Sequence, residues 1–485
     1  MIASVPYLMG MRIGDSGNMW VEGTNALQHQ GNYMKNLMYA RLGNLPFWLL
    51  SCMSLYFIVK GVYGSRVAFL SVVLFTLVPP LLGHAAIAYT DTALVAGILL
   101  FAWQLREFVE KQTIQRSVAL GAAIGVAVAA KYSAIPYIAA SLVAVGLLQF
   151  ARPFTADHVQ MRKLRFAHVL AAGVVATLVL WGCFRFSLEP VSANVRRNHP
   201  TIIKFFGWSP QAEEHAYRAL VTPIPLSELV RGVNAVAFHA KQGHWDYHFG
   251  RVDKDGSWYY FPVMLALTIP ASLLLLCLVG VWSLFRRSAE SPRGTQMLYL
   301  CLVGICVLTI NMMSSINIGY RHNLAVYPFV CILGAIGLKS LWRNPARWPK
   351  WIAIICFSSC MVESAAAHPK YTAFINILAN HKSTELCIDS AEGGDEWRLA
   401  ERLRRLKANH VCLGLTGPLP LAAFGFPDYI RLERNKPCKG YVAVDLYRLH
   451  FDFQNAYPPD TGLQWLERYK PIEKIGSSIL LYRIE

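Results

Sequence analysis

Long apolar stretches separated by short basic loops dominate the chain between about residues 45 and 366. The stretches cover 45–62, 66–82, 92–105, 118–130, 135–150, 166–186, 258–284, 297–313, 323–341 and 351–363. The pattern predicts an α-helical, polytopic membrane protein with about ten transmembrane helices. Several stretches are shorter than the roughly 20 residues that a straight crossing needs, so the pattern leaves the helix ends and one or two crossings open.

Composition supports a membrane protein over a soluble one. The chain is 54% hydrophobic and only 15% charged, and its mean hydropathy is +0.34. A net charge of +17 would suit a nucleic-acid-binding protein. However, the basic residues lie in short loops between apolar helices, where the positive-inside rule places them. We therefore expect membrane lipids, and no nucleic acid, among the partners.

Cysteine use does not indicate a disulfide framework. Of the 11 cysteines, all but Cys387, Cys412 and Cys438 lie inside apolar stretches. In such stretches cysteine behaves as a small hydrophobic residue.

The short loops predict the orientation in the membrane. Their basic clusters are Arg106/Lys111/Arg116, Arg152/Arg162/Lys163/Arg165, Arg286/Arg287/Arg293 and Arg343/Arg347/Lys350. Loops of this kind are cytoplasmic. One alternation then places residues 1–44, the 83–91 turn, the Lys131 turn, the 187–257 loop, the NIGYRHN turn and everything after about Ala366 outside. We predict a multi-pass membrane protein.

Three segments flank or interrupt the membrane domain of residues 45–366. Residues 1–44 are polar and suit an outer loop or interfacial segment. The long outer loop 187–257 contains PLSELVRGVNAVAFHAKQGH, which places Leu226, Leu229, Val233 and Val236 on one helical face. A helix lying in the membrane interface and a helix packed on the membrane domain explain this face equally well.

The composition changes after residue 366. CIDS, HVCLGL, YVAVDL and SSILLYRI have the pattern of short strands, and GDEWRLAERLRRLKA and GLQWLERY that of helices. Residues 367–485 therefore predict a small soluble α/β domain on the outer side.

Ionisable and aromatic residues gather at the predicted outer ends of the helices. They are His84, Asp91, Lys131, Tyr259, Tyr260, Arg321 and His322. Ionisable residues at membrane depth are costly and indicate function by default. Arginine and lysine hold phosphate oxygens by charge-assisted hydrogen bonds, and a carboxylate accepts a proton from an acceptor hydroxyl or amine. We assign Asp91 and His84 as catalytic candidates and the other five as substrate-binding candidates.

Each candidate also has a structural explanation. Lys131 and Arg321 suit snorkelling or interfacial residues, and the tyrosines suit an aromatic belt. Asp91 could cap the helix that starts at Thr92, and a histidine such as His84 is more often structural than catalytic. The sequence shows neither zinc-ligand spacing nor a specific glycine-rich nucleotide loop, so no cofactor is predicted, although a divalent metal stays possible.

Five blocks around these residues resemble a known family. HAAIAYTDTAL, GAAIGVAVAAKYSAIP, GSWYYFPVMLALTIP, NIGYRHNLAVYP and AAHPKYTAFIN are similar, in this order, to bacterial membrane glycosyltransferases related to protein O-mannosyltransferases and lipid A aminoarabinose transferases, in the GT-C superfamily. The resemblance begins near Asn32 and includes IDSAEGGDEWRLAERLRRL in the C-terminal domain. It implies an inverting enzyme of the bacterial inner (plasma) membrane. Such an enzyme transfers a sugar from a polyprenyl-phosphate-linked donor to a glycan, lipid or protein acceptor on the outer, periplasmic side.

By position, the resemblance gives Asp91 the role of the family's second outer-loop carboxylate and Lys131 and Arg321 those of phosphate-side cations. The family's principal Asp-Glu pair in the first outer loop has no counterpart, since Asp15 and Glu22 do not match it. We expect the chain to begin after that motif. Thr268 stands before Ile269-Pro270, where relatives often have Lys before Thr-Pro.

Two other classes of function remain as alternatives. An inactive membrane scaffold is compatible with the missing Asp-Glu pair. A transporter or lipid flippase should show internal repeats with broken helices near the midplane, and the sequence shows no such symmetry.

Overall fold

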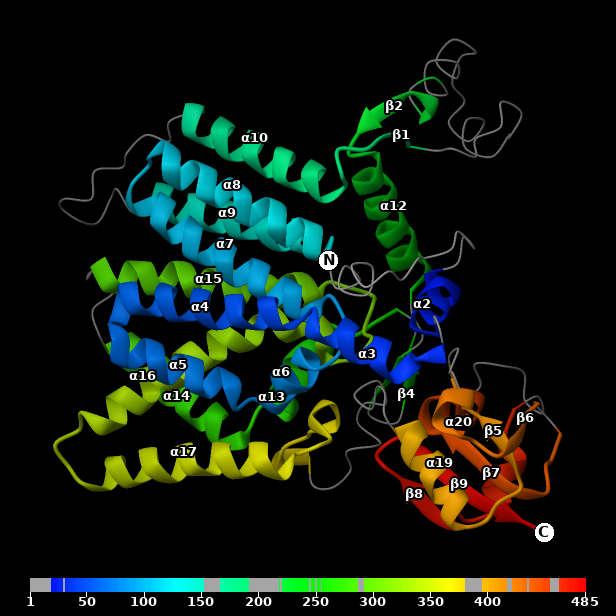
Figure 1. Ribbon diagram of the computed structural model, residues 1–485. Coiled ribbons are helices and arrows are strands. Elements are labelled where there is room, and N and C mark those ends of the chain that lie inside the picture. The colour runs from blue at the N-terminus through cyan, green and yellow to red at the C-terminus, as the bar shows by residue number, and fades with distance from the viewer. Residues whose placement is uncertain are drawn as a thin grey trace.

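Figure 1 shows a computed structural model of the chain, in which a bundle of helices lies beside a small C-terminal α/β domain. The structure describes residues 19–28, 31–151, 166–191, 218, 220–243, 246–248, 251–253, 255–286, 292–379, 395–416, 421–433, 436–453 and 462–485. The described residues are mostly helical, and the expected fold class is confirmed.

Every apolar stretch singled out in the sequence is helical. The bundle consists of α4 (Leu45–Tyr63), α5 (Ser65–Thr76), α6 (Pro79–Ala85), α7 (Asp91–Glu110), α8 (Ile114–Ala130), α9 (Ala134–Ala151), α10 (Phe166–Cys183), α13 (Tyr260–Thr268), α14 (Ala271–Arg286), α15 (Pro292–Met312), the 3-10 helix η4 (Tyr320–Val326), α16 (Tyr327–Trp342) and α17 (Trp348–Ala366).

The number of membrane crossings differs from the expected count. Among the described residues, 4 helical segments are long and apolar enough to span a bilayer, or up to 6 if each of two bent pairs forms one span. The stretches 66–82 and 258–284 are not single helices, because they bend by 72° between α5 and α6 and by 112° between α13 and α14. Both breaks occur at a proline, which lacks the N–H and clashes with the preceding turn. The chain is a multi-pass membrane protein, but about ten crossings is not confirmed.

The break between α13 and α14 is closed by side chains from distant parts of the chain. The Asn376 amide donates to the carbonyls of Ala266 and Ile269 at 2.7 and 2.6 Å. The Glu363 carboxylate of α17 accepts the first N–H of α14, from Ala271, at 3.3 Å. Polar backbone groups freed inside an apolar bundle are costly unless they find partners within the protein. These two side chains therefore make the bend tolerable.

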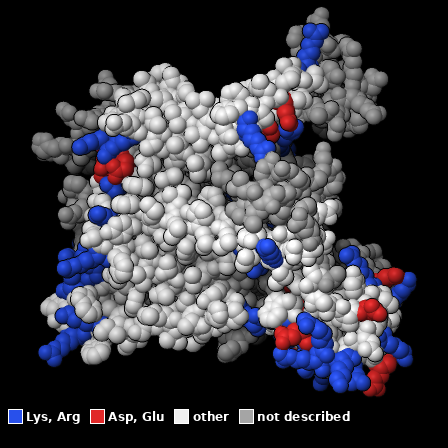
Figure 2. All heavy atoms as spheres, viewed as in Figure 1, with Lys and Arg blue, Asp and Glu red and all other residues white. Residues whose placement is uncertain are grey.

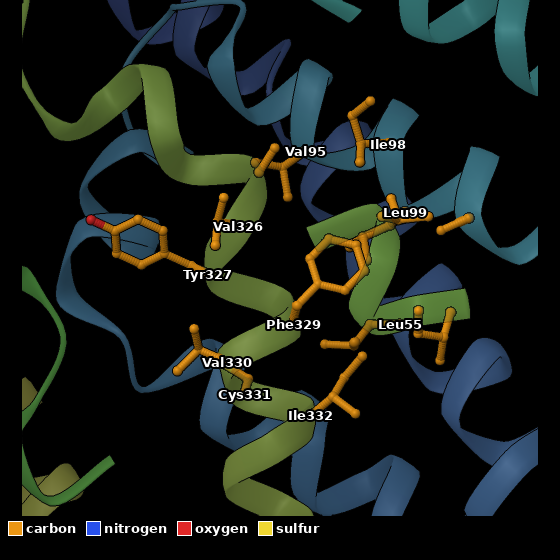
Figure 3. Close-up of a cluster of buried hydrophobic side chains, with 14 of the residues drawn as sticks. Leu55, Val95, Ile98, Leu99, Val326, Tyr327, Phe329, Val330, Cys331 and Ile332 are labelled. Atoms are coloured by element: carbon orange, nitrogen blue, oxygen red, sulfur yellow. The ribbon is translucent and has the colours of Figure 1, made fainter. Parts of the chain in front are cut away.

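The core of the bundle lies where α4, α7 and α16 meet. Figure 3 shows Leu55, Ile98, Leu99 and Phe329 pointing toward one another from these helices. The facing side chains are 0–5% exposed. Close packing of this kind fixes the helix positions, because interiors have the density of organic crystals.

The helices α14 and α16 touch through glycines. A Cβ built on Gly337 would meet the Leu276 carbonyl oxygen at 2.0 Å, and one on Gly280 would meet the Leu333 carbonyl oxygen at 2.0 Å. Small residues of this kind let two membrane helices approach each other closely.

The C-terminal domain contains a five-stranded sheet of order β6-β5-β7-β9-β8. Its strands are β5 (His410–Gly414), β6 (Asp428–Arg431), β7 (Gly440–Asp445), β8 (Glu473–Ile475) and β9 (Ile479–Ile484), and its helices are α19 (Asp395–Arg405), α20 (Leu446–Phe453) and the 3-10 helix η9 (Gln464–Arg468). β5 pairs in parallel with β6 and β7, while β9 is antiparallel to β7 and β8.

Sequence expectations for this domain are largely confirmed. Three of the expected strands and the helix at GDEWRLAERLRRLKA are present, whereas GLQWLERY forms the single-turn η9, and CIDS lies outside the described residues. Asp395, 5% exposed, fastens α19 to the β8–β9 turn by accepting the backbone N–H groups of Ser477 and Ser478 at 2.7 and 3.0 Å. A disulfide joins Cys412 to Cys438.

The remaining described segments lie on the side of the bundle where the C-terminal domain also lies (Figure 1). They are α2 (Met19–Gln28), α3 (Tyr33–Leu42), β1 (Leu188–Pro190), β2 (Pro223–Pro225), α12 (Ser227–Gln242), β3 (Asp246–His248) and β4 (Arg251–Asp253). Leu229 of α12 packs on the core, as expected of a helix packed on the membrane domain, while Val233 and Val236 are 39% and 46% exposed. A location of α12 in the membrane interface stays a prediction. The domain boundaries at residues 44 and 366 stay predictions.

We predict that Gly337→Ala lowers the stability of the bundle by about 2–3 kcal/mol, because the new methyl group must push apart two backbones. The matched control is Gly146→Ala, since a Cβ there would meet nothing within 4 Å. Alanine is the better helix former, so the control should be neutral or slightly stabilising. Thermal unfolding of the two purified variants in detergent measures the difference, and equal unfolding temperatures would contradict the packing.

Candidate active site

Buried polar side chains bond to the backbone of the turn between α6 and α7. Asn44, 0% exposed, donates from its amide to the His84 carbonyl at 3.4 Å and also to the Ile87 carbonyl. The Thr92 hydroxyl donates to the same His84 carbonyl at 2.9 Å. These bonds satisfy backbone groups released where α6 ends. They also fix the distance between His84 and Asp91 along the turn.

Asp91 and Lys131 form an ion pair at the end of the bundle. Asp91 is the first residue of α7 and its side chain is 5% exposed, whereas Lys131 directly follows α8 and its side chain is 24% exposed. The Lys131 ammonium donates to Asp91 Oδ1 at 2.6 Å. Because α7 and α8 are antiparallel neighbours, the start of one and the end of the other meet. The pair neutralises a carboxylate that would be costly to bury alone.

A buried network positions the η4 turn that carries Arg321 and His322. The Asn311 amide of α15 donates to the His322 carbonyl at 3.2 Å and to the Asn323 side-chain oxygen at 3.1 Å. The Tyr137 hydroxyl of α9 bonds to the Asn311 side chain. Side chains in this network are 0–4% exposed. Buried hydrogen bonds of this kind restrict the segments that they join, so η4 has a defined place beside α7.

Five of the seven predicted site residues converge. The Asp91 carboxylate lies within electrostatic range of Lys131, His84 and His322, and His84 within range of Arg321. The Arg321 guanidinium lies over the Tyr89 ring at 5.3 Å, and the His84 ring meets the Tyr320 ring edge to face at 5.6 Å. Residues separated by more than 200 positions thus form one group with a carboxylate, two cations and two imidazoles.

The two predicted tyrosines lie at the start of α13, which also contacts η4. Tyr259 is 37% exposed and stands next to Trp258, 69% exposed. Tyr260 is 0% exposed and packs against Phe261 within the core. Tyr259 can therefore meet a ligand from outside the bundle, whereas Tyr260 is placed to support the helix.

The geometry bears on the structural explanations for these residues. Asp91 bonds to Lys131 and caps no helix N–H within the described chain, and the N-cap position is Thr90, without a side-chain cap. Lys131 likewise is not a free snorkelling lysine, since its ammonium is held by Asp91.

The supporting residues Asn44, Asn311 and Asn323 were not predicted. Their signal in the sequence is a side-chain amide within or next to an apolar stretch. Burying such a group costs free energy unless it forms hydrogen bonds.

Metal binding receives no support from the side chains of the described residues. No group of three or more His, Cys, Asp or Glu side chains among them could hold a metal ion.

A family model described as dolichyl-phosphate-mannose-protein mannosyltransferase matches residues 33–181. The chain resembles the GT-C glycosyltransferases. The matched segment holds three of the converging residues, His84, Asp91 and Lys131, and it ends before η4. It is a minority of the chain, and it confirms the expected resemblance for that part. No curated protein sequence matches the chain.

Solved structures of two membrane glycosyltransferases are similar at low identity. ArnT from Cupriavidus metallidurans, bound to undecaprenyl phosphate, is 13% identical with a TM-score of 0.47, over 99% of this chain and 92% of that one. The oligosaccharyltransferase AglB from Archaeoglobus fulgidus, with an inhibitory peptide and a dolichol-phosphate, is 12% identical with a TM-score of 0.43, over 89% of this chain and 62% of that one. Values this low do not by themselves assign an activity.

We predict that Lys131→Met destabilises the protein by about 3 kcal/mol, because it leaves the Asp91 carboxylate buried without its partner. The double variant Asp91→Asn/Lys131→Met removes both charges and should recover most of that loss. Thermal unfolding of the wild type, both single variants and the double variant forms a double-mutant cycle. Additive effects would show that the two side chains do not interact.

Proposed function

We propose that this chain is a membrane glycosyltransferase that moves a sugar from a polyprenyl-phosphate-linked donor to an acceptor at the Asp91 end of the bundle. The observation that carries the proposal is the convergence of one buried carboxylate with Lys131, Arg321 and two histidines. The match to a family whose description names a dolichyl-phosphate-linked mannose supports this class of donor.

The proposed reaction is a direct displacement at the anomeric carbon. The acceptor hydroxyl or amine loses its proton to the Asp91 carboxylate and forms a bond to that carbon. The bond from the carbon to the phosphate oxygen breaks on the opposite side, and polyprenyl phosphate leaves with the electron pair. Fixed cations stabilise the charge that develops on the leaving phosphate, and Lys131 and Arg321 are the cations in place for this.

The ion pair suggests how substrate binding prepares the carboxylate. A carboxylate that accepts a bond from an ammonium at 2.6 Å is a weak base. A donor phosphate that draws Lys131 toward itself would free Asp91 to accept the acceptor's proton. Lys131 is the more exposed partner, with 24% of its side chain accessible against 5% for Asp91, so it is the one that can turn.

Two observations support an outer location for this end of the bundle and for the C-terminal domain. Lysine and arginine gather along the left edge of the bundle in Figure 2, opposite the C-terminal domain. Basic ends of membrane helices face the cytoplasm. The Cys412–Cys438 disulfide suits an oxidising compartment such as the periplasm.

A transporter is the second candidate because the structure contains two broken helical stretches, which the sequence did not reveal. Transporters build their substrate sites from such helices near the bilayer midplane. Here α6 and α13 both contact η4. The breaks therefore serve the charged cluster at one end of the bundle, which favours an enzyme.

We predict that Asp91→Asn lowers sugar transfer by roughly 10²–10⁴, because it removes the general base while keeping the size of the side chain. The matched control is Asp428→Asn, on the exposed strand β6, which should transfer at the wild-type rate. The assay is transfer from a polyprenyl-phosphate sugar in proteoliposomes. Equal transfer by both variants would make Asp91 structural, and absence of transfer by the wild type from every donor tried would favour the scaffold.

Orientation can be tested by labelling single cysteines in intact cells on a cysteine-free background. Ile377→Cys, at a position 82% exposed beyond α17, should react with an impermeant reagent. Arg347→Cys, in the exposed turn between α16 and α17, should react only after permeabilisation, because its basic loop is proposed to be cytoplasmic. The reverse pattern would overturn the proposed topology.

A further inference from the structure

A cavity lies at the other end of α7, far from Asp91. Its volume is about 460 Å³, and α4, α7 and α8 line it through Phe57, Lys60, Gly61, Trp103, Arg106 and Arg116, among others. Neither the proposed reaction nor the positioning of its residues uses this cavity.

The charges around the cavity leave one cation without a carboxylate. The Arg106 side chain, 7% exposed, lies 3.0 Å from Glu107 and 3.2 Å from Glu110, and Arg116 lies 2.8 Å from Glu107. Lys60 forms no ion pair with any described residue, and its ammonium lies 5.6 Å and 6.0 Å from the Tyr56 and Phe57 ring centroids. The three cations thus outnumber the two carboxylates, so the cavity can accept an anion.

The Arg106 guanidinium is held in place by α4. It donates to the Ile58 carbonyl of α4 at 3.3 Å, and a Cβ on Gly61 would meet its Nη1 at 2.1 Å. A glycine at this place on α4 therefore makes room for the guanidinium. The cationic wall of the cavity is held in position before any ligand arrives.

The opposite wall is aromatic and continues into an apolar stripe. Phe57 and Trp103 stack with ring centroids 5.1 Å apart. Phe57 is 38% exposed, and Leu45, Leu49 and Met53 of the same helix are 47%, 60% and 55% exposed. Residues four apart lie on one face of a helix, so these side chains form a continuous stripe about 18 Å long. The stripe offers the length of an acyl chain and ends at Lys60.

We propose that this cavity binds the headgroup of an anionic phospholipid, with one acyl chain along the Leu45–Phe57 stripe of α4. Basic pockets between membrane helices on the cytoplasmic side bind anionic headgroups. The lipid phosphate accepts from Lys60 and Arg116, and the glycerol region lies against Phe57 and Trp103. A small soluble phosphate would use the cations but would leave the aromatic wall and the stripe without a role.

The test uses the full chain in detergent micelles with native mass spectrometry to titrate dioleoylphosphatidylglycerol. Lys60→Glu should weaken binding about 30-fold, because each charge near an anionic lipid contributes about a factor of five. The matched control is Arg347→Glu, an exposed cation at the same end of the bundle, which should change binding less than about three-fold. Thermal unfolding verifies that both variants fold.

A second arm distinguishes a lipid from a soluble anion. Phe57→Ala should weaken binding of the phospholipid, while glycerol phosphate should bind far more weakly than the lipid to every variant. Equal losses from Lys60→Glu and Arg347→Glu would mean unspecific attraction to the basic surface and would overturn the proposal. If glycerol phosphate binds as tightly as the lipid, and Lys60→Glu weakens that binding too, the ligand of the cavity is a soluble phosphate and the lipid proposal is wrong.

Discussion

The constraint on which the structure depends is that an apolar bundle must satisfy its own polar backbone groups. Two of the apolar stretches bend sharply at proline, and each bend frees N–H and C=O groups that lipid cannot bond. At the bend between α13 and α14, Asn376 and Glu363 supply the missing partners from other segments, and Asn44 does the same for the carbonyls where α6 ends. These bonds also tie the 366–379 segment and α17 to the break between α13 and α14, and the residue before α4 to the turn that precedes Asp91.

The charged cluster follows from this arrangement. The short helix α6 ends at Ala85, so the turn that carries His84 and Asp91 lies between α6 and α7 at one end of the bundle. The Lys131 ammonium then compensates Asp91, and the Asn311 network brings η4 with Arg321 and His322 to the same place. Stability and function share residues here, because the ion pair that permits burial of Asp91 also controls how basic it is.

The two ends of α7 have opposite chemistry. At its start one carboxylate is buried among cations and imidazoles, and at its end Arg106 is buried between Glu107 and Glu110 beside a cavity with an unbalanced Lys60. An apolar span of helix separates the two groups. In the proposed topology each charged group lies near a membrane surface, where water and lipid phosphates are available and the cost of burial is lowest.

The sequence by itself determined the class of fold, the helical nature of each apolar stretch, most of the C-terminal strands and the identity of the converging charged residues. These follow from local pattern, since apolar runs and alternation report what one segment buries. Asp91 and Lys131 could be placed at one end by counting crossings. Their ion pair could not be predicted, because it depends on which helices are neighbours.

Only the tertiary structure decided where helices break and which side chains bond the backbone groups freed there. Pro270 signals a possible bend, but the 112° angle requires Asn376, more than 100 residues away, to bond the freed carbonyls. The burial of Tyr260 beside the exposed Tyr259 is another case, because both residues have the same local pattern and differ only in what packs around them. Contacts between distant segments leave no periodic trace in the chain, so pattern predicts the elements, and packing decides which of their residues meet.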